Sequence, residues 1–282
     1  MLSFKCNVCG STTGKEVLTI HKPDRFEKAL GVKENGYKRQ WMICEQCGTA
    51  VNCMSRESVE AVNNLASSYY EIDLGGESDL QQRFDFIMDL PEDKSDNAGR
   101  VERILNYLNK QETDFETIEI CDVGCGLGVF PSKIMEVSGS YGLDNIRITG
   151  IEPDPTSYNF AKNLSQFPVI QGFFPEVIEG KIFDLITLNK VLEHISEPVD
   201  MMRSVAEHLK ENSGLTYVEV PCVTNAWLKS PNDNSLGALH YNLYSVDSLS
   251  SLLNDVGLTT VLAERIIEPS GKISVYAIAS NL

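Results

Sequence analysis

The chain has 282 residues, and its 42% hydrophobic and 23% charged composition is typical of a folded protein large enough for a full core. Its net charge is −16, although residues 1–60 alone are slightly basic, with nine Lys or Arg against seven Asp or Glu. Because no run of Lys or Arg provides a basic patch, we expect no nucleic acid partner. The sequence also lacks an apolar stretch of about 18 residues and a signal peptide, so we expect no membrane span and a cytoplasmic location.

Two Cys-x-x-Cys-Gly segments lie close to the N-terminus. Each segment places two thiolates on one edge of a metal ion, and two such segments together make a closed tetrahedral site. They predict a structural Zn²⁺ ion bound by Cys6, Cys9, Cys44 and Cys47. Redox-active thiols and free buried cysteines are the alternatives. The 34 residues between the pairs can hold a hairpin or a short helix, and we expect residues 1–60 to form a zinc-ribbon domain.

A helical connecting segment is predicted for residues 61–112. Residues 57–65 and 100–108 have apolar side chains at helical spacing, whereas the polar stretch 89–99, with Pro91 and Gly99, is typical of a loop. Strand-like runs then follow at residues 118–123, 146–151, 183–188 and 215–220, with helical segments between them. This alternation predicts that residues 113–282 form an α/β domain, a Rossmann-like, doubly wound and mostly parallel sheet with helices on both faces.

A glycine-rich loop follows the first of these strands, which ends at Asp122. The spacing Gly-x-Gly-x-Gly differs from the Gly-x-Gly-x-x-Gly of dinucleotide-binding loops. A carboxylate beside a pyrophosphate would be repelled, but beside an ammonium and a sulfonium group it is attracted. Glu152 ends the second strand, where an acid accepts hydrogen bonds from two ribose hydroxyls. The other candidate cofactor-binding residues of these two segments are Gly124, Cys125, Gly126, Gly128 and Pro153.

This pattern resembles the cofactor signature of class I S-adenosylmethionine-dependent methyltransferases. The resemblance continues through residues 171–175, where Gly172 and Phe173 would border the adenine, and through residues 183–195, which resemble the fourth strand and its Leu-Glu-His turn. It covers about residues 115–282 and implies a seven-stranded sheet with an antiparallel last strand. By the same resemblance Asn189 would line the methyl channel. Tyr70, in the helical connecting segment, is expected to cover the cofactor, with ordinary packing as the alternative.

The N-terminal residues resemble the zinc-binding region of bacterial methyltransferases that act on sugars. The similarity rests on residues 23–27, Tyr37, Trp41 and the second cysteine pair, and it implies a nucleotide-linked sugar or a surface-glycan precursor as acceptor. Sugar C-methyltransferases of that type carry a further C-terminal domain, so we expect O-methylation here. The alternatives are methylation of a carbon, an amine or another natural product, an NAD-linked oxidoreductase, and a non-enzymatic adaptor. The sequence is also compatible with a homodimer.

Methyl transfer to a hydroxyl requires a positioned acceptor and a group that takes its proton. The first candidate for this base is His240, in the long loop 221–244, which we expect to form a lid over the acceptor. His194 is the second candidate, with a purely loop-orienting role as its alternative, and Glu219 is the third. Arg100 is expected in a surface ion pair on its own helix, with binding of the methionine carboxylate of the cofactor as the alternative. No second Asp, Glu or His cluster is apparent, so a catalytic metal is not expected.

Overall fold

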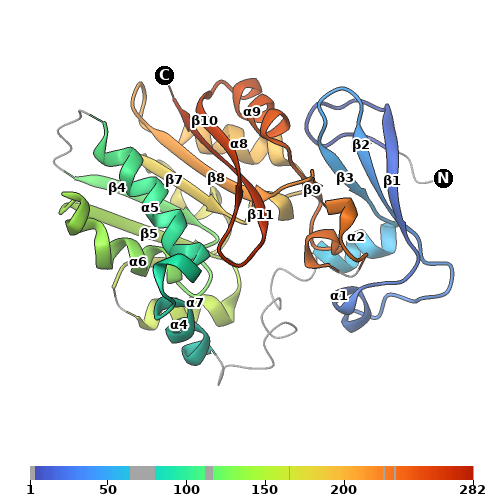
Figure 1. The fold of residues 1–282 in the computed structure, drawn as a ribbon, viewed down its shortest axis with the longest axis horizontal. Helices are drawn as coiled ribbons and strands as arrows, with labels where there is room; N and C mark the ends of the chain where they lie inside the picture. Colours follow the sequence, from blue (N-terminus) through green and yellow to red (C-terminus); the bar gives the residue numbers. More distant parts are fainter. Residues whose placement is uncertain are drawn as a thin grey trace.

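A computed structural model represents the chain, and it describes residues 4–63, 80–111, 117–164, 166–224, 226–231 and 233–281. The described residues form a seven-stranded sheet with helices around it and a separate four-stranded sheet that contains the N-terminal strands (Figure 1). The strands are β1 (Gly14–Ile20), β2 (Arg39–Cys44), β3 (Ala50–Cys53), β4 (Ile118–Val123), β5 (Ile146–Glu152), β6 (Val169–Gln171), β7 (Leu185–Asn189), β8 (Leu215–Pro221), β9 (Asn242–Leu243), β10 (Thr259–Ile267) and β11 (Ile273–Ser280).

The α-helices vary from five to fourteen residues, and short 3₁₀ turns lie between several elements. The α-helices are α1 (Arg25–Ala29), α2 (Arg56–Asn63), α4 (Leu80–Met88), α5 (Asp96–Asn109), α6 (Val129–Val137), α7 (Pro155–Asn163), α8 (Pro198–Glu207) and α9 (Val246–Asp255). The 3₁₀ turns are η3 (Glu92–Lys94), η4 (Ser138–Tyr141), η5 (Glu176–Ile178), η6 (Leu192–His194), η7 (Ala226–Leu228) and η8 (Asn234–Leu236).

The large sheet has the strand order β10-β11-β8-β7-β4-β5-β6. Strands β8, β7, β4, β5 and β6 run parallel, and β11 lies between β10 and β8 and is antiparallel to both. The expected Rossmann-like sheet of seven mostly parallel strands is therefore confirmed. Because parallel strands end at one edge, the polar residues at the carboxyl ends of β4, β5, β7 and β8 come together there.

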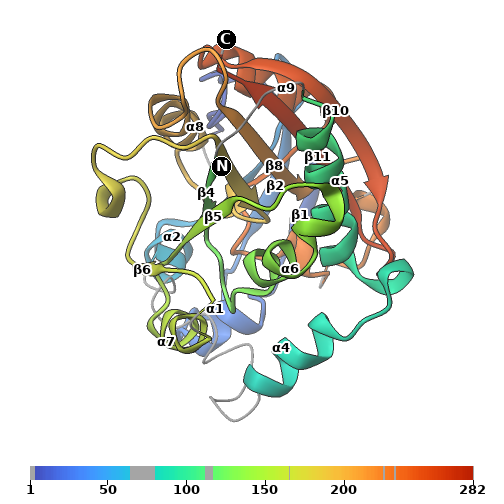
Figure 2. The same cartoon turned by 90° about the vertical axis from the view of Figure 1, so that its left-hand side faces the viewer.

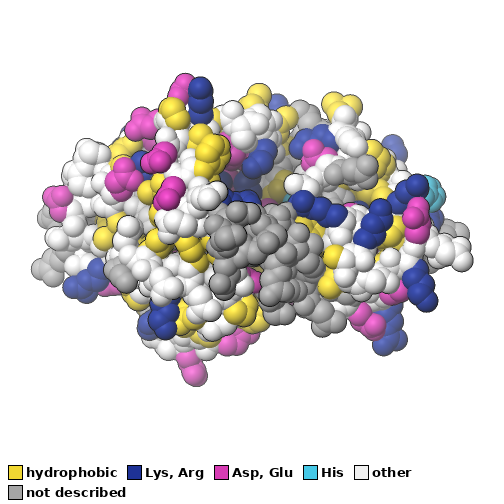
Figure 3. Space-filling view, turned by 90° about the horizontal axis from the view of Figure 1, so that it is seen from below, with side chains coloured by type: hydrophobic (Ala, Val, Ile, Leu, Met, Phe, Trp, Pro, Cys, Tyr) yellow, Lys and Arg dark blue, Asp and Glu magenta, His cyan; other side chains and the backbone are white. Residues whose placement is uncertain are grey.

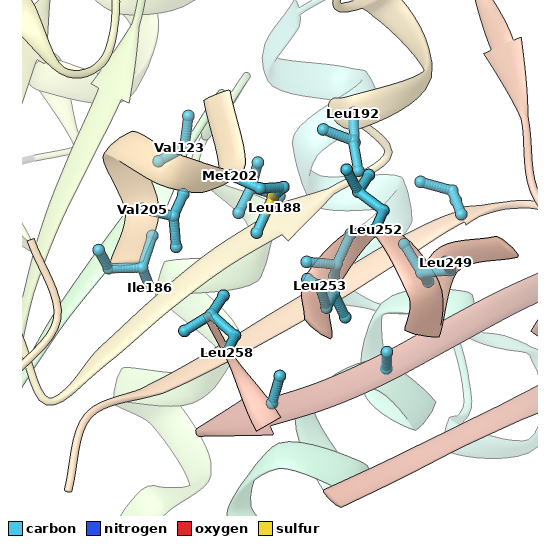
Figure 4. Close-up of a cluster of buried hydrophobic side chains, with 14 of the residues drawn as sticks. Val123, Ile186, Leu188, Leu192, Met202, Val205, Leu249, Leu252, Leu253 and Leu258 are labelled. Carbon is cyan, nitrogen blue, oxygen red and sulfur yellow. The ribbon is translucent and has the colours of Figure 1, made fainter. Parts of the chain in front are cut away.

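Helices cover both faces of this sheet, as the view in Figure 2 shows. On one face, α5 and α6 pack against the strands through Ile104, Leu105 and Ile134, which are almost completely buried. On the other face, α8 and α9 bury a larger apolar cluster, in which Met202 and Leu252 point toward Leu188 of β7 (Figure 4). Burial of these side chains supplies most of the driving force for folding this part of the chain.

The four-stranded sheet has the order β1-β2-β3-β9, so its last strand comes from residues 242–243 rather than from the N-terminal region. Trp41 of β2 is completely buried, and its indole N–H donates to the carbonyl of Leu236 at 3.3 Å. Arg39 is also buried and donates to the same carbonyl at 2.7 Å. The long loop that we expected to form a lid is thus packed against the N-terminal sheet.

Helix α5 begins earlier than the sequence predicts. The stretch 89–99 was expected to be a loop, but η3 lies within it and α5 starts at Asp96. Ser95 caps the helix, because its hydroxyl accepts a hydrogen bond from the backbone N–H of Ala98 at 3.1 Å. The cap allows Gly99 to lie inside the first turns of a helix, so the loop expectation was wrong for residues 96–99.

The charge is divided between the two parts of the molecule. Figure 3 shows more Lys and Arg side chains over the N-terminal part and more Asp and Glu side chains over the part built on the large sheet. This agrees with the slightly basic residues 1–60 and the strongly acidic remainder. None of the described helices is both long and apolar enough to cross a membrane.

Candidate active site

The glycine loop joins β4 to α6 at the carboxyl edge of the large sheet. Gly124, Gly126 and Gly128 have φ values of 68°, 55° and 78°, a left-handed conformation that favours glycine. A Cβ atom at Gly124 would also lie only 2.7 Å from Cγ2 of Val191. Glycine is therefore required at Gly124 both by the turn and by the close approach of the loop that follows β7.

Asp122 lies directly before this loop and is almost completely buried. Its Oδ1 accepts hydrogen bonds from the Thr187 hydroxyl at 2.7 Å and from the Asn189 amide at 3.0 Å, both on the neighbouring strand β7. Burial raises the pKa of the Asp122 carboxyl to about 7, although these two hydrogen bonds oppose the shift. The Oδ1 of Asn189 is buried and has no hydrogen-bond partner among the residues that the structure describes.

Glu152 ends β5 on the other side of the loop. One oxygen of its carboxylate accepts from the Gly126 N–H at 2.7 Å and the other from the Asp154 N–H at 2.8 Å. Burial raises the pKa of the Glu152 carboxyl to about 7. Asp122 and Glu152 thus flank the glycine loop as two buried acids on adjacent parallel strands.

The remaining expected cofactor residues lie around this edge, with one exception. Pro153 follows Glu152 directly, and Gly172 follows β6 with a φ of 142°. The Phe173 side chain is 57% exposed, so a face of its ring is open to a ligand. The Cys125 side chain is buried against Gly150 of β5, which leaves only its backbone to face a ligand. Tyr70 lies outside the described residues.

The two candidate histidines, although 46 residues apart in the sequence, meet in the structure. His194 ends η6 after β7, and its ring centroid lies 4.7 Å from that of His240. Each ring places its Nδ1 near a backbone carbonyl, that of Leu239 at 2.9 Å for His194 and that of Ser235 at 3.0 Å for His240. Burial and the nearby His194 lower the pKa of His240 to about 3, so this ring is neutral at physiological pH.

Glu193 joins the two rings, although the sequence pattern did not indicate it as a site residue. Ligand atoms of Glu193, His194 and His240 lie within 4.8 Å of one another, so the expectation that no second Asp, Glu or His cluster exists was wrong. Glu193 is 1% exposed, its Oε2 has no hydrogen-bond partner within the described part of the chain, and burial raises the pKa of its carboxyl. Spacing along the sequence could not reveal this cluster, because His240 lies far from the other two residues.

The loop that carries His240 is held in place by the N-terminal sheet. The Asn52 side chain of β3 donates to the carbonyl of His240 at 2.8 Å, and its backbone N–H donates to the carbonyl of Tyr241 at 2.9 Å. Tyr241 in turn donates its N–H to the carbonyl of Glu193 at 2.7 Å. The two parts of the molecule therefore meet at the histidine pair.

Glu219, the third candidate base, lies in a buried network of charges. Its carboxylate accepts from Arg100 at 2.5 Å and from Arg103 at 2.7 Å, and it lies 3.3 Å from the Lys190 ammonium. Burial alone would raise its pKa, but the Arg100 and Lys190 charges hold the pKa of Glu219 well below its usual range. A carboxylate so occupied is a weak proton acceptor, and we do not retain it as the base. Arg100 is likewise not in a surface pair.

The four expected metal ligands also come together. The Sγ atoms of Cys6 and Cys47 are 3.5 Å apart, as are those of Cys9 and Cys44, and all four lie within 4.8 Å of one another. Cys6 and Cys44 are buried, and the other two are partly exposed. No disulfide bond joins any two of these four cysteines. The first pair lies at a turn before β1, and the second pair begins at Cys44, the last residue of β2, so both pairs lie at one end of the N-terminal sheet.

A known protein family matches the part of the chain that forms most of the large sheet. A family model described as "Methyltransferase domain" matches residues 94–263, which is more than half of the chain. The matched range begins just before α5 and includes the glycine loop, both buried acids and the histidine pair.

Curated relatives match a smaller part of this chain than the family model does. The mitochondrial ubiquinone biosynthesis O-methyltransferase of Schizosaccharomyces pombe is 29% identical over 133 residues, which cover 40% of this chain and 46% of that protein. The ubiquinone biosynthesis O-methyltransferase of Rickettsia canadensis is 25% identical over 118 residues, which cover 41% of this chain and 48% of that protein. The chain thus spans about half the length of these relatives.

Solved structures share the fold at low sequence identity. Magnesium protoporphyrin IX methyltransferase from Synechocystis PCC 6803, with bound SAH, has a TM-score of 0.55 and 14% identity, covering 78% of this chain and 98% of that one. A plantazolicin methyltransferase in complex with SAH has a TM-score of 0.54 and 13% identity, covering 80% of this chain and 99% of that one. At such identities the similarity concerns the fold.

Proposed function

The chain belongs to the methyltransferase domain family, and from this premise we propose that it transfers a methyl group from S-adenosylmethionine to a hydroxyl oxygen of a small molecule. The expectation of a class I methyltransferase domain is confirmed by the family match and by the fold. The observation that carries the proposal is the pair of buried acids, Asp122 and Glu152, on either side of the glycine loop.

The residues at this edge fit S-adenosylmethionine. Asp122 offers a negative charge to a ligand that carries an ammonium and a sulfonium group. Glu152 retains lone pairs for ribose hydroxyls, because each of its oxygens accepts only one backbone hydrogen bond. The Oδ1 of Asn189, which is buried and has no partner among the described residues, is a further acceptor. We propose that Gly172 and the exposed ring of Phe173 border the adenine.

The cofactor supplies a methyl group on a positively charged sulfur, and the protein must orient the acceptor and help its hydroxyl to lose a proton. We assign this second task to the histidine pair. The nitrogens of His194 and His240 that face away from the Leu239 and Ser235 carbonyls carry lone pairs. His240 is a weak proton acceptor because of its low pKa, so of the two rings His194 is the better candidate for a direct base.

The proposed methyl acceptor is a hydroxyl group of a small molecule. The relatives named as O-methyltransferases support oxygen as the methylated atom, and the resemblance of residues 1–60 to sugar methyltransferases supports a nucleotide-linked sugar. An acceptor of the kind named for the relatives, a ubiquinone precursor, is the second candidate. Incubating the protein with S-adenosylmethionine and each acceptor class, and detecting a product one methyl group heavier, tests the proposal. Failure of every hydroxyl acceptor, with transfer to an amine or carbon instead, would contradict it.

The Glu152→Ala substitution is expected to weaken the binding of S-adenosylmethionine by roughly 100-fold, because hydrogen bonds to a charged group contribute about 1.5–3 kcal/mol. Isothermal titration with S-adenosylmethionine and S-adenosylhomocysteine measures the change. The matched control is Glu136→Ala, at an exposed position on α6, which should bind both ligands like the wild type. Unchanged binding in Glu152→Ala would mean that this carboxylate does not contact the ribose.

Binding of S-adenosylmethionine is expected to weaken as the pH falls. The pKa values of Asp122 and Glu152 are raised to about 7, so both are mostly ionised at pH 8 and mostly protonated at pH 6. A group with such a pKa loses about nine tenths of its ionised form between these values, so each carboxylate that must be charged weakens binding about tenfold. Titrations at several pH values test this. An affinity that is constant from pH 8 to pH 6 would contradict the assigned roles.

We propose that the cluster of Cys6, Cys9, Cys44 and Cys47 binds a structural Zn²⁺ ion. Four thiol sulfurs within 4.8 Å of one another fit the tetrahedral arrangement in which zinc–sulfur distances are about 2.3 Å. Four protein ligands leave no position open for substrate, so the role of this ion is to hold the N-terminal sheet together. Since that sheet includes β9 and anchors His240, the ion would also support the histidine pair.

A further inference from the structure

Glu193, His194 and His240 make a second cluster of metal-ligating side chains, separate from the four cysteines. The Glu193 carboxylate is almost completely buried, and its Oε2 has no partner among the described residues. Leaving a carboxylate oxygen buried without a partner is costly unless a cation or a hydrogen-bond donor meets it. An unpartnered oxygen beside two imidazole rings points to a ligand that the three side chains share.

The backbone fixes which nitrogen of each ring can bind that ligand. A carbonyl oxygen can only accept a hydrogen bond, so the Nδ1 atoms of His194 and His240 must carry the proton in the neutral rings. Each Nε2 is then left with a lone pair. Metal-binding histidines characteristically donate their second ring N–H to a backbone carbonyl or a carboxylate, which fixes the tautomer and the orientation of the ring. Both rings have this arrangement.

The surrounding loop is rigidly held. The Arg39 guanidinium donates to the carbonyl of Leu236 at 2.7 Å, and the Ala238 N–H donates to Asp24 at 2.6 Å. These contacts fix residues 235–240, which supply both carbonyl acceptors and His240 itself. Glu193 and His194 come from η6, after β7, so the cluster forms only when the loop is packed between the two sheets.

From this arrangement we propose that Glu193, His194 and His240 bind a divalent transition-metal ion, for which Zn²⁺ and Co²⁺ are suitable probes. Two imidazoles and one carboxylate suit zinc, cobalt or iron, whereas magnesium and calcium take mainly oxygen ligands. Three protein ligands leave at least one position open. The proposal rests on the proposed function in one respect, because we assign the open position to the acceptor hydroxyl.

An ion in this position would activate the hydroxyl in place of a protein base, because the Nε2 lone pair with which His194 would otherwise take the proton is then bound to the ion. Binding of an oxygen to a divalent metal lowers the pKa of its proton, which can then pass to water. The oxygen forms the new bond to the methyl carbon as the bond from that carbon to sulfur breaks, and S-adenosylhomocysteine leaves. No oxidation or reduction occurs, so the reaction does not require the bound ion to change its oxidation state, and Zn²⁺ and Co²⁺ are equally suitable.

Metal content tests the site independently of activity. After equilibration with Zn²⁺ and removal of free ion, the wild type is expected to retain one equivalent more than the Glu193→Gln and His194→Ala variants. His208→Ala, in a histidine outside the cluster, is the matched control and should retain as much zinc as the wild type. In a Co²⁺ titration, the cysteine site should give thiolate-to-cobalt absorption in the near ultraviolet, and the second equivalent should bind without adding to it.

Equal zinc content in the wild type and in both cluster variants would overturn the proposal. Titration with S-adenosylhomocysteine separates this result from a failure of the proposed function. If the ligand binds at the glycine loop but no second metal equivalent is found, the histidines act without a metal and the methyltransferase assignment stands. If the second equivalent binds but S-adenosylhomocysteine does not, the metal site stands and the assignment of the glycine loop fails.

Discussion

Replacing Cys44 by serine is expected to abolish zinc binding at the cysteine cluster and to lower the free energy of unfolding by about 5 kcal/mol or more. Cys44 is buried at the end of β2, the strand that lies between β1 and β3. Its Sγ lies 3.5 Å from that of Cys9, and a hydroxyl is a much poorer zinc ligand than a thiolate. Because a structural metal site contributes its binding energy directly to folding, loss of one ligand should destabilise the whole N-terminal sheet.

Zinc analysis and urea denaturation of the Cys44→Ser variant measure the two effects. The matched control is Cys53→Ser, because Cys53 is also buried in this sheet but is not part of the cluster. The control should keep its zinc and lose much less stability. In Cys44→Ser, the loss of stability should extend to the histidine pair, since the loop with His240 is anchored to β3 through Asn52. A Cys44→Ser protein with wild-type stability would rule out a structural metal.

The Glu219→Gln substitution is expected to lower the free energy of unfolding by about 3–5 kcal/mol, although it conserves the volume of the side chain. Glu219 is completely buried, and its carboxylate is shared by Arg100, Arg103 and Lys190. A neutral amide would leave these cations with one buried anion fewer. Its N–H₂ group can only donate hydrogen bonds, so it would face the N–H donors of the arginines without accepting from them. Because the wild-type carboxylate has a depressed pKa, its contribution should also be lost in strong acid.

Urea denaturation of Glu219→Gln at neutral pH tests the size of this effect. Glu264→Gln, on the exposed edge strand β10, is the matched control, because Glu264 accepts one hydrogen bond from Tyr276 at 2.7 Å at a more exposed position. This control should change stability by less than about 0.5 kcal/mol. If Glu219→Gln were as stable as the control, the buried network would not be a stabilising feature. If it were stable and inactive, Glu219 would have to be reconsidered as a base.

Much of the large sheet could be predicted because its signals are local. Strands β4 and β5 are short, mainly apolar runs with an acid at or next to the last residue, and their bounds agree closely with the expected ones. The start of α5 was missed because Pro91 and Gly99 were given more weight than the capping side chain of Ser95. Strand β9 has only two residues, and it exists only because β3 lies beside it. No periodicity in the sequence could have indicated it.

By itself, the sequence determined the features that depend on neighbouring residues. These are the glycine loop, the acids Asp122 and Glu152 at strand ends, and the two cysteine pairs, because their geometry follows from spacing within a few residues. Only the tertiary structure decided which distant groups meet. It placed His240 beside Glu193 and His194, and it occupied Glu219 with cations from α5 and the loop after β7. Burial and the partners of a charged or polar group set its protonation and its chemistry, and both arise only when separate segments pack together.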